Sequence, residues 1–445
     1  MLEGYRIEGR RAADIAADVE RAVGAGALEP GQLLPPMREL AAELGVNPNT
    51  VASAYRTLRE RGVIETDGRR GSRVRAKPAT TGREYVRHEV PDGVRDVADG
   101  NPDPALLPSL AQAFAAAGAQ SDRDPVRYGD ALVEPELARI ARAALDADGV
   151  PDGPLAVTSG SLDAIERVLG AHLKPGDTVA VEDPGWGGLL DLVPALGLRT
   201  AAVGVDDEGP LPGDVRRALA AGARALIVTD RAQNPTGAAV SAVRATALRA
   251  VLREHPETLL IEDDHGHGIV ELPVHPLAGI TRHWVFVRSV AKAYGPDLRL
   301  AVLTGDPVTV DRVAGRHRLG PGWVSRIIQR AVVRLWSDGA LDTRAVAAAY
   351  GERRAALIGA LAERGIVAHG RSGLNVWVPV PDETEVVARL LHGGWAVAPG
   401  ARFRMSAGPG IRVTVAALGE GEVGALADAI ASAVGVGWAR ARGRA

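Results

Sequence analysis

The sequence predicts a small, mostly helical N-terminal domain over residues 1–77, a linker over residues 78–95 and a large α/β domain over residues 96–445. Three observations predict this division. Apolar residues recur at helical spacing in the first 60 residues, the stretch around residues 76–95 mixes Pro, Thr, Gly and charge without periodicity, and short apolar runs then alternate with helical patterns. A chain of 445 residues, 46% hydrophobic and 24% charged, can bury a large core.

Composition narrows the classes of function. The chain has no cysteine, which excludes disulfides, thiol catalysis and Cys-ligated zinc. No apolar run reaches membrane-spanning length and the first residues lack the apolar core of a signal peptide, so we expect a cytoplasmic protein without membrane partners. Residues 38–77 carry nine Lys and Arg against five Asp and Glu, a net charge of +4, although the whole chain carries −3. This basic patch indicates nucleic acid as a partner of the first domain only.

The first domain contains a helix-turn-helix pattern. A helix is predicted over residues 11–25, a second over Met37–Leu44, and a third over Asn47–Arg61, with Asn47 as its N-cap and Pro48 at its first position. In this motif the third helix enters the major groove of DNA by its N-terminal end. The inward positions are predicted to be Val51, Ala54 and Leu58, and the exposed face carries side chains suited to bases and phosphates: Asn49, Thr50, Ser53 and Arg56.

Residues 63–74 read as a β-hairpin with Arg69 and Arg70 at its tip, a wing that would contact the DNA backbone or the minor groove. The alternative is a three-helix scaffold without a DNA-binding role. The arginine-rich tip and the polar face of the third helix favour the DNA-binding interpretation.

Residues 10–75 resemble the winged-helix domain of the GntR family of bacterial regulators. The resemblance is carried by the segment from Pro30 to Ala41, by Asn47-Pro48-Asn49-Thr50-Val51 and by Ala54-Tyr55. It implies that Arg38 and the start of the third helix contact double-stranded operator DNA. The predicted DNA-binding set is therefore Arg38, Asn47, Asn49, Thr50, Ser53, Tyr55, Arg56, Arg69 and Arg70.

The large domain is predicted to have a mostly parallel sheet. Its strand candidates are Leu155–Thr158, Thr178–Glu182, Ala223–Thr229, Thr258–Glu262 and Trp284–Arg288, separated by helices such as Leu162–Leu173, Gly187–Leu196 and Val243–His255. Ligand-binding residues of such sheets lie at the carboxyl ends of the strands. The residues at those strand ends are therefore the candidates for a functional site.

Lys292 follows the last of these strands. Only three of the 52 basic residues are lysine; Lys77 lies in a polar stretch and Lys174 opens a surface turn, whereas Lys292 ends an apolar run. A partly desolvated amine has a lowered pKa, which suits it to Schiff-base formation. The alternative is a lysine that extends from a strand end into solvent.

Polar residues follow the other strands as well. Thr158–Leu162 combines a strand end with a helix start, which forms a phosphate cradle of backbone N–H groups. Trp186, the Asn234-Pro235-Thr236-Gly237 turn and the Glu262–His265 stretch follow three more strands. Each pattern alone is common in structural loops, but their joint occurrence in this order is very improbable by chance.

The order resembles that of the fold type I aminotransferases over residues 96–435, which implies pyridoxal 5′-phosphate as cofactor and a smaller C-terminal α/β subdomain. The resemblance implies that Lys292 is the Schiff-base lysine, that Asp263 holds the pyridine N–H, and that Asn234 binds the ring hydroxyl. Trp186 would stack on the ring, Tyr128 would reach the phosphate in the partner subunit's site, and Arg412 would bind a substrate carboxylate. The phosphate ligands would be Gly160, Ser161, Ser289 and Arg299.

One position departs from that family. His265 stands where a tyrosine usually binds the ring oxygen of the cofactor, and its protonation would couple cofactor binding to pH. The Glu262–His267 stretch also allows a metal site, because carboxylates and paired histidines are plausible ligands. The match of Asp263 and Lys292 to the family favours the cofactor, and we expect no metal.

Both parts together resemble the MocR-type subfamily of GntR regulators. The resemblance implies a homodimeric transcriptional regulator that senses pyridoxal phosphate, an amino compound, or both. An active aminotransferase with a DNA-binding appendage is the main alternative, and a cofactor-free dimerisation body is a third.

Overall fold

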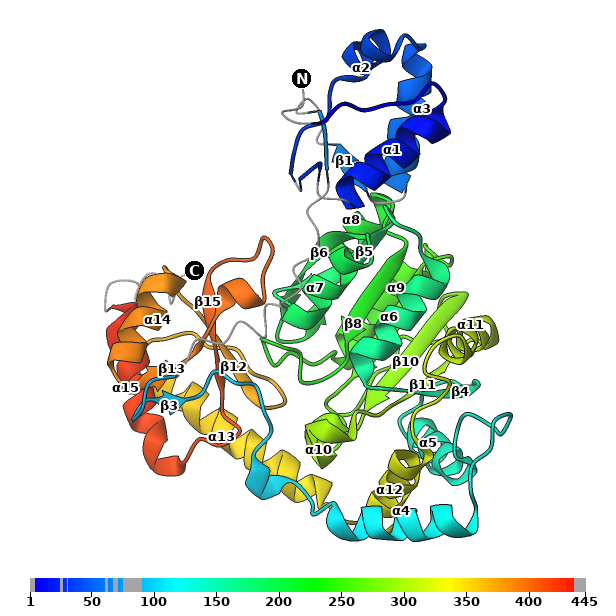
Figure 1. Ribbon diagram of the computed structural model, residues 1–445. Helices are drawn as coiled ribbons and strands as arrows, with labels where there is room; N and C mark the ends of the chain where they lie inside the picture. The colour runs from blue at the N-terminus through cyan, green and yellow to red at the C-terminus, as the bar shows by residue number, and fades with distance from the viewer. Residues whose placement is uncertain are drawn as a thin grey trace. The chain divides into compact units, whose positions relative to one another are not determined.

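The computed structural model describes residues 5–24, 27–29, 31–60, 63–66, 71–74 and 90–435. The chain forms two compact units, a small one built mainly from residues 1–82 and a large one that holds most of residues 83–445 (Figure 1). Residues 75–89, which include most of the predicted linker, lie outside the described residues. The predicted domain boundaries therefore stay predictions.

The small unit is a three-helix domain with a hairpin. Its helices are α1 (Ala12–Gly24), α2 (Met37–Leu44) and α3 (Pro48–Glu60), and its strands β1 (Ile64–Thr66) and β2 (Ser72–Val74) pair antiparallel. The apolar positions of the helices form the core, in which Ile15, Val19, Leu40 and Leu58 are at most 1% exposed. The side-chain oxygen of Asn47 accepts a hydrogen bond from the Asn49 N–H at 2.9 Å, which satisfies a backbone donor at the start of α3.

The large unit is built on an eight-stranded sheet in the order β4-β11-β10-β9-β8-β5-β6-β7. Strands β5, β8, β9 and β10 run parallel, whereas β11 is antiparallel to both of its neighbours. The bounds are β4 (Leu155–Thr158), β5 (Thr178–Asp183), β6 (Arg199–Asp206), β7 (Gly209–Pro210), β8 (Ala225–Thr229), β9 (Leu259–Asp264), β10 (His283–Ser289) and β11 (Ala301–Gly305).

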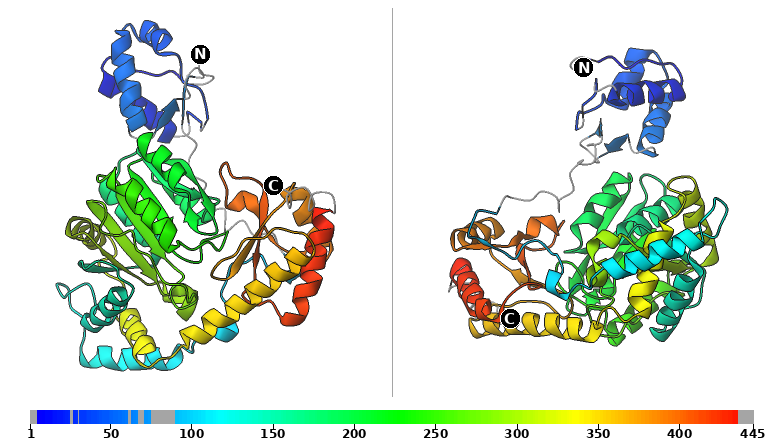
Figure 2. Two further views of the ribbon diagram at one scale, coloured as in Figure 1. Left: turned by 180° about the vertical axis from the view of Figure 1, so that it is seen from behind. Right: turned by 60° about the horizontal axis from the view of Figure 1, so that its bottom comes forward.

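Helices cover this sheet and lead to a C-terminal subdomain. Figure 2 shows α13 (Thr343–Glu363) running from α12 (Arg326–Ser337) to the subdomain, where it packs beside α15 (Glu420–Val434). The subdomain sheet has the order β12-β15-β14, with β12 (Asn375–Pro379), β14 (Ala398–Pro399) and β15 (Gly410–Thr414). The remaining helices are α4 (Ala111–Arg123), α5 (Pro135–Ala147), α6 (Ser161–His172), α7 (Gly187–Ala195), α8 (Pro212–Ala220), α9 (Ala242–Arg253), α10 (Ala291–Tyr294), α11 (Pro307–Arg318) and α14 (Glu383–His392).

The predicted strands and helices are found close to their expected bounds. The strand Leu155–Thr158 and the helix Met37–Leu44 match the prediction, and the other strands differ by one or two residues at an end. Arg95, the last residue of the predicted linker, begins β3 (Arg95–Asp96), which pairs parallel with β13 (Trp395–Ala396). Among the helices that the structure describes, none is both long and apolar enough to span a membrane.

Candidate functional site

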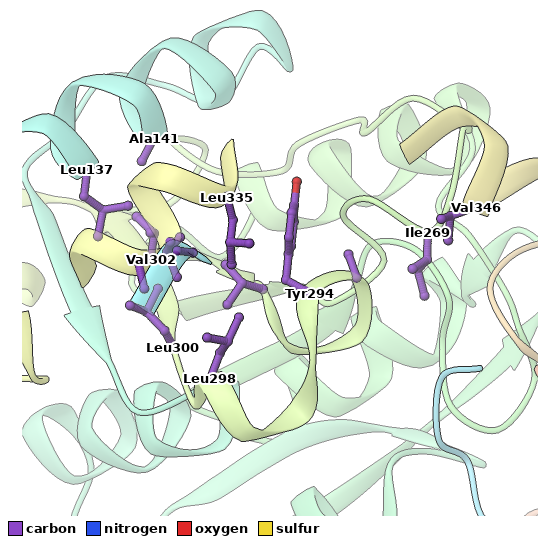
Figure 3. Packing of buried hydrophobic residues seen from close by; sticks show 14 of the residues in the cluster. Leu137, Ala141, Ile269, Tyr294, Leu298, Leu300, Val302, Leu335 and Val346 are labelled. Carbon is purple, nitrogen blue, oxygen red and sulfur yellow. The ribbon is translucent and has the colours of Figure 1, made fainter. Parts of the chain in front are cut away.

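Lys292 lies in the short helix α10, directly after β10. The residues around it, Val290, Ala293 and Tyr294, are buried in a core cluster that also holds Leu298 (Figure 3). This packing fixes the turn and leaves Lys292 half-buried, with its Nζ donating a hydrogen bond to the Gly100 carbonyl at 2.8 Å. The amine is therefore held by a rigid support, as a Schiff-base lysine requires.

Asp263 and His265 form a buried pair at the end of β9. The His265 Nδ1 lies 2.9 Å from the Asp263 Oδ2, and its Nε2 lies 2.8 Å from the Ala232 carbonyl oxygen. Both partners are acceptors, so this arrangement requires a doubly protonated ring. Burial lowers the pKa of His265, but the Asp263 carboxylate and the Ala232 carbonyl together raise it above its ordinary value. Because both ring nitrogens are engaged, His265 orients Asp263, and the structure shows no free donor on it for a ring oxygen.

The second oxygen of Asp263 is different. Asp263 is 2% exposed, and its Oδ1 has no hydrogen-bond partner in the described part of the chain. An unpaired buried acceptor costs on the order of 1–3 kcal/mol or more. A pyridinium N–H would satisfy this oxygen, which is the role predicted for Asp263.

The predicted phosphate cradle lies where β4 meets α6. The Ser161 hydroxyl is buried and has no hydrogen-bond partner among the described residues, and the Arg299 Nη2 donates to the Ser159 carbonyl at 3.0 Å. A Cβ atom at Gly160, where φ is +100°, would lie 2.7 Å from the Arg299 Nη2. Glycine thus brings the backbone at the helix start next to a guanidinium, which together form an anion site.

Arg412 lies on the central strand of the C-terminal subdomain, opposite Trp377 and Ala398. It is 4% exposed, and it donates to the Asn234 side-chain oxygen at 3.0 Å and to the Ala98 carbonyl at 2.6 Å. The site therefore joins the large sheet, the subdomain and the segment around Gly100. A buried guanidinium that is held in place by neutral oxygen acceptors is suited to bind a carboxylate ligand.

The remaining predicted site residues have varied surroundings. Trp186 follows Gly185 at the end of β5 and is half-buried, and the Ser289 hydroxyl accepts a hydrogen bond from the Ala291 N–H at 3.2 Å. Tyr128 is 94% exposed, and its ring meets that of Trp323 edge-on at 5.6 Å. Tyr128 therefore contributes nothing to the site within its own chain.

These donors and acceptors fit pyridoxal phosphate. An anion cradle around Ser161 and Arg299, an unpaired buried carboxylate oxygen on Asp263 and the anchored amine of Lys292 match its phosphate, its ring nitrogen and its aldehyde. The roles of the individual residues stay predictions.

The small unit presents the predicted DNA-binding face. Asn47, Asn49, Ser53 and Arg56 are exposed, Thr50 is partly exposed, and Arg38 is exposed on α2. The prediction for Tyr55 was wrong: it is 1% exposed, and its hydroxyl donates to the Pro35 carbonyl at 2.8 Å, so it packs in the domain core. Its position four residues after Val51, on the same helix face, was the available signal. Arg69 and Arg70 lie outside the described residues.

Two protein-family models match this chain, one for the small N-terminal domain and one for the large domain. Residues 11–74 match the model of the bacterial regulatory proteins of the gntR family, and residues 93–430 match aminotransferase class I and II. The chain belongs to the MocR-type GntR regulators. It is therefore a DNA-binding transcriptional regulator whose large domain has the fold type I aminotransferase architecture and takes pyridoxal phosphate as its cofactor.

This regulator is similar to two named transcriptional regulators and to an aminotransferase of known structure. It is 40% identical to the vitamin B6 salvage pathway transcriptional repressor PtsJ of Salmonella typhimurium, over 96% of this chain and 99% of the repressor. It is 28% identical to the pyridoxine biosynthesis regulator PdxR of Corynebacterium glutamicum, over 71% of this chain and 67% of PdxR. Aspartate aminotransferase of Thermus thermophilus with maleate is 26% identical, with a TM-score of 0.67 over 76% of this chain and 91% of the enzyme.

Several residues of the regulator's site were missed by sequence reasoning. Arg231 and Arg288 flank the buried Asp264 carboxylate at 2.8 and 3.0 Å, and their charges hold the pKa of Asp264 well below its usual range despite its burial. The Asp264 carboxylate, which was one of the possible metal ligands in the Glu262–His267 stretch, is therefore bound by two arginines. The described residues contain no group of three or more metal-ligating side chains. The apolar run before Asp264 signalled burial, but nothing local indicated the arginine partners.

Three further acids of the regulator, Glu182, Asp230 and Glu262, are buried at the carboxyl ends of β5, β8 and β9. Burial raises the pKa of Glu262 to about 7, and burial together with the nearby Glu262 charge raises the pKa of Asp230 well above its usual range. Burial also raises the pKa of Glu182 to about 7. The folded protein therefore holds protons that the unfolded chain releases above pH 4.5.

This arrangement predicts that stability falls with rising pH. The stabilisation from protonated Glu262 is present below its unfolded pKa and is lost as pH rises through about 7. Glu262→Gln should reduce the fall in unfolding free energy between about pH 4.5 and pH 7, with a residual slope from Glu182 and Asp230. Urea denaturation at a series of pH values measures this pH dependence of the unfolding free energy. The exposed Glu257→Gln should leave the slope unchanged, and an equal slope in Glu262→Gln would contradict the assignment.

Proposed function

We propose that this regulator binds operator DNA through the exposed face of α3 and changes its hold on DNA when pyridoxal phosphate and an amino compound occupy the large domain. The observation that carries the proposal is the presence, in one chain, of an exposed recognition helix and an anchored lysine beside unsatisfied cofactor ligands. The 40% identity to a vitamin B6 salvage repressor supports vitamin B6 genes as the target. Such a role places the protein in the cytoplasm with the DNA.

Pyridoxal phosphate supplies an aldehyde that condenses with amines and a ring that withdraws electrons. The chain's own residues would bind and orient it: Ser161 and Arg299 at the phosphate, Asp263 at the ring nitrogen and Trp186 against the ring face. Arg412 would bind the carboxylate of an amino acid effector. Regulation requires that the ligand bind the two DNA-binding states with different affinity.

We also propose that the regulator is a homodimer. Tyr128 and Leu319 are more than nine-tenths exposed, and Ile327 is 42% exposed. Large apolar and aromatic side chains that project from α12 and the neighbouring loops favour burial against a second copy. This supports the predicted role of Tyr128 in the partner subunit's site, and sedimentation equilibrium would test the dimer.

Operator affinity tests the function. The wild-type protein is titrated with the promoter of a vitamin B6 gene, with and without pyridoxal phosphate and a panel of amino acids and amines. We expect the cofactor, alone or with one amino compound, to change the dissociation constant at least fivefold, the lower end of common allosteric couplings. Release of a keto acid in the same mixtures would instead favour an aminotransferase with a DNA-binding appendage.

Arg38→Ala is the matched DNA-contact variant in this assay. Loss of a phosphate-contacting arginine should weaken binding to all sequences and reduce the slope of log affinity against log salt by about one. Arg21→Ala, an exposed arginine on α1 that pairs with Asp18, is the control. An unchanged salt slope in Arg38→Ala would remove Arg38 from the interface.

A further inference from the structure

Asp183, the last residue of β5, accepts four hydrogen bonds from one distant loop, residues 405–407. Its Oδ1 accepts from the Met405 N–H at 2.9 Å, and its Oδ2 accepts from the Ser406 N–H, the Ser406 hydroxyl and the Ala407 N–H at 2.8, 2.7 and 2.9 Å. Asp183 is 4% exposed. Four hydrogen bonds to one buried carboxylate fix the loop firmly, because each bond is charge-assisted.

Residues just after β5 also bind Phe403, which lies shortly before this loop in the sequence. The Gly185 N–H donates to the Phe403 carbonyl at 2.7 Å, so residues 403–407 are tied to residues 183–185 along their length. The Phe403 ring is 1% exposed and lies beneath Arg412, with the guanidinium carbon 4.6 Å from the ring centroid. A cation over an aromatic face is attracted to it and is restricted in orientation.

These contacts form a continuous support from β5 to Arg412. We propose that Asp183 is a positioning residue that sets the orientation of Arg412 through Phe403 and so determines the preference for effectors that carry a carboxylate. The inference rests on the proposed function, since it takes Arg412 as the effector's anion site. Trp186 lies three residues after Asp183, so residues 183–186 would contribute both to the predicted stacking on the cofactor ring and to the orientation of Arg412.

Asp183→Asn separates the hydrogen-bonding role of Asp183 from the space that its side chain fills. An Asn side chain has almost the same shape, but only one of its two terminal atoms accepts hydrogen bonds. Its amide NH₂ would face either the Met405 N–H or the three donors of Ser406 and Ala407, so the loop must shift. Ser406→Ala removes a single hydroxyl donor and leaves the backbone bonds, and it should have a smaller effect in the same direction.

Two stable conjugates measure the preference without any reaction. N-(5′-phosphopyridoxyl)-L-leucine and its decarboxylated counterpart, N-(5′-phosphopyridoxyl)-3-methylbutylamine, differ only in the α-carboxylate, and calorimetry on the full-length protein gives both dissociation constants. We expect the wild type to bind the leucine conjugate at least about tenfold more tightly. Asp183→Asn should reduce this ratio by about three- to tenfold and leave the affinity for the amine conjugate within about twofold.

Two further variants test whether the effect of Asp183→Asn acts through Phe403 and Arg412. Asp214→Asn changes another acid that accepts a backbone hydrogen bond, from the Gly204 N–H, and should keep the wild-type ratio. Phe403→Leu should lower the ratio like Asp183→Asn, and it carries the test if Asp183→Asn does not fold. A ratio that stays at the wild-type value, or an equal loss of affinity for both conjugates, would overturn the positioning role. Failure of the wild type to bind either conjugate would overturn the proposed function and this inference with it.

Discussion

Replacing Lys292 by alanine is expected to abolish covalent attachment of pyridoxal phosphate. The turn that carries Lys292 is held by buried Val290, Ala293 and Tyr294, so removal of the half-buried Lys292 side chain, which is not part of this cluster, is expected to leave the fold intact. Borohydride reduction in the presence of the cofactor, followed by intact-protein mass spectrometry, should show one pyridoxyl group on the wild type and none on the variant. Thermal denaturation should be unchanged within a few degrees.

The control for this experiment is the exposed Lys174→Ala, which should be labelled like the wild type. Because the sequence has only three lysines, peptide mapping can assign the modification without ambiguity. A pyridoxyl group that persists at full occupancy in Lys292→Ala would contradict the Schiff-base assignment.

Asp263→Asn is expected to lower cofactor affinity by about 30- to 150-fold, which corresponds to loss of a charged hydrogen bond of about 2–3 kcal/mol. The amide cannot stabilise a protonated ring nitrogen, because its NH₂ donates where the Asp263 Oδ1 would accept. The variant also weakens the bond to the His265 Nδ1, whose pKa should fall as the neighbouring negative charge is removed. Equilibrium titration followed by the cofactor's absorbance measures the affinity.

Asp311→Asn, an exposed acid on α11, is the matched control and should bind the cofactor like the wild type. NMR titration of His265 in Asp263→Asn separates the two effects. Unchanged affinity together with a lowered His265 pKa would show that Asp263 serves the histidine and not the ring.

The sheet of the large domain was predictable because its strands are buried on both faces. Thr178–Asp183, Ala225–Thr229 and Leu259–Asp264 read as continuous apolar runs that end in polar residues, and the structure places those polar residues at one edge of the sheet. Lys292 stood out because arginine replaces lysine almost everywhere else. Local sequence therefore sufficed to locate the strand ends, and the resemblance supplied the cofactor-ligand roles, which stay predictions.

Long-range partners were not predictable in this way. Asp183 contacts a loop more than 220 residues away, and Phe403 acts on Arg412 through ring geometry that no sequence period encodes. The engagement of His265 by the Ala232 carbonyl depends on an unusual backbone at Ala232, where φ is +57°. Such contacts depend on how separate segments meet, which only the folded structure shows.

The close approach of backbone to arginine at two glycines limits how this site can evolve. A Cβ at Gly100 would lie 2.8 Å from the Arg412 Nη2, as one at Gly160 would crowd Arg299. Any side chain at either position would displace a guanidinium that is predicted to bind a ligand's negative charge. A saturation library selected for ligand binding should therefore retain glycine at both positions. New ligand preferences are therefore expected to arise at other predicted site residues, such as Trp186.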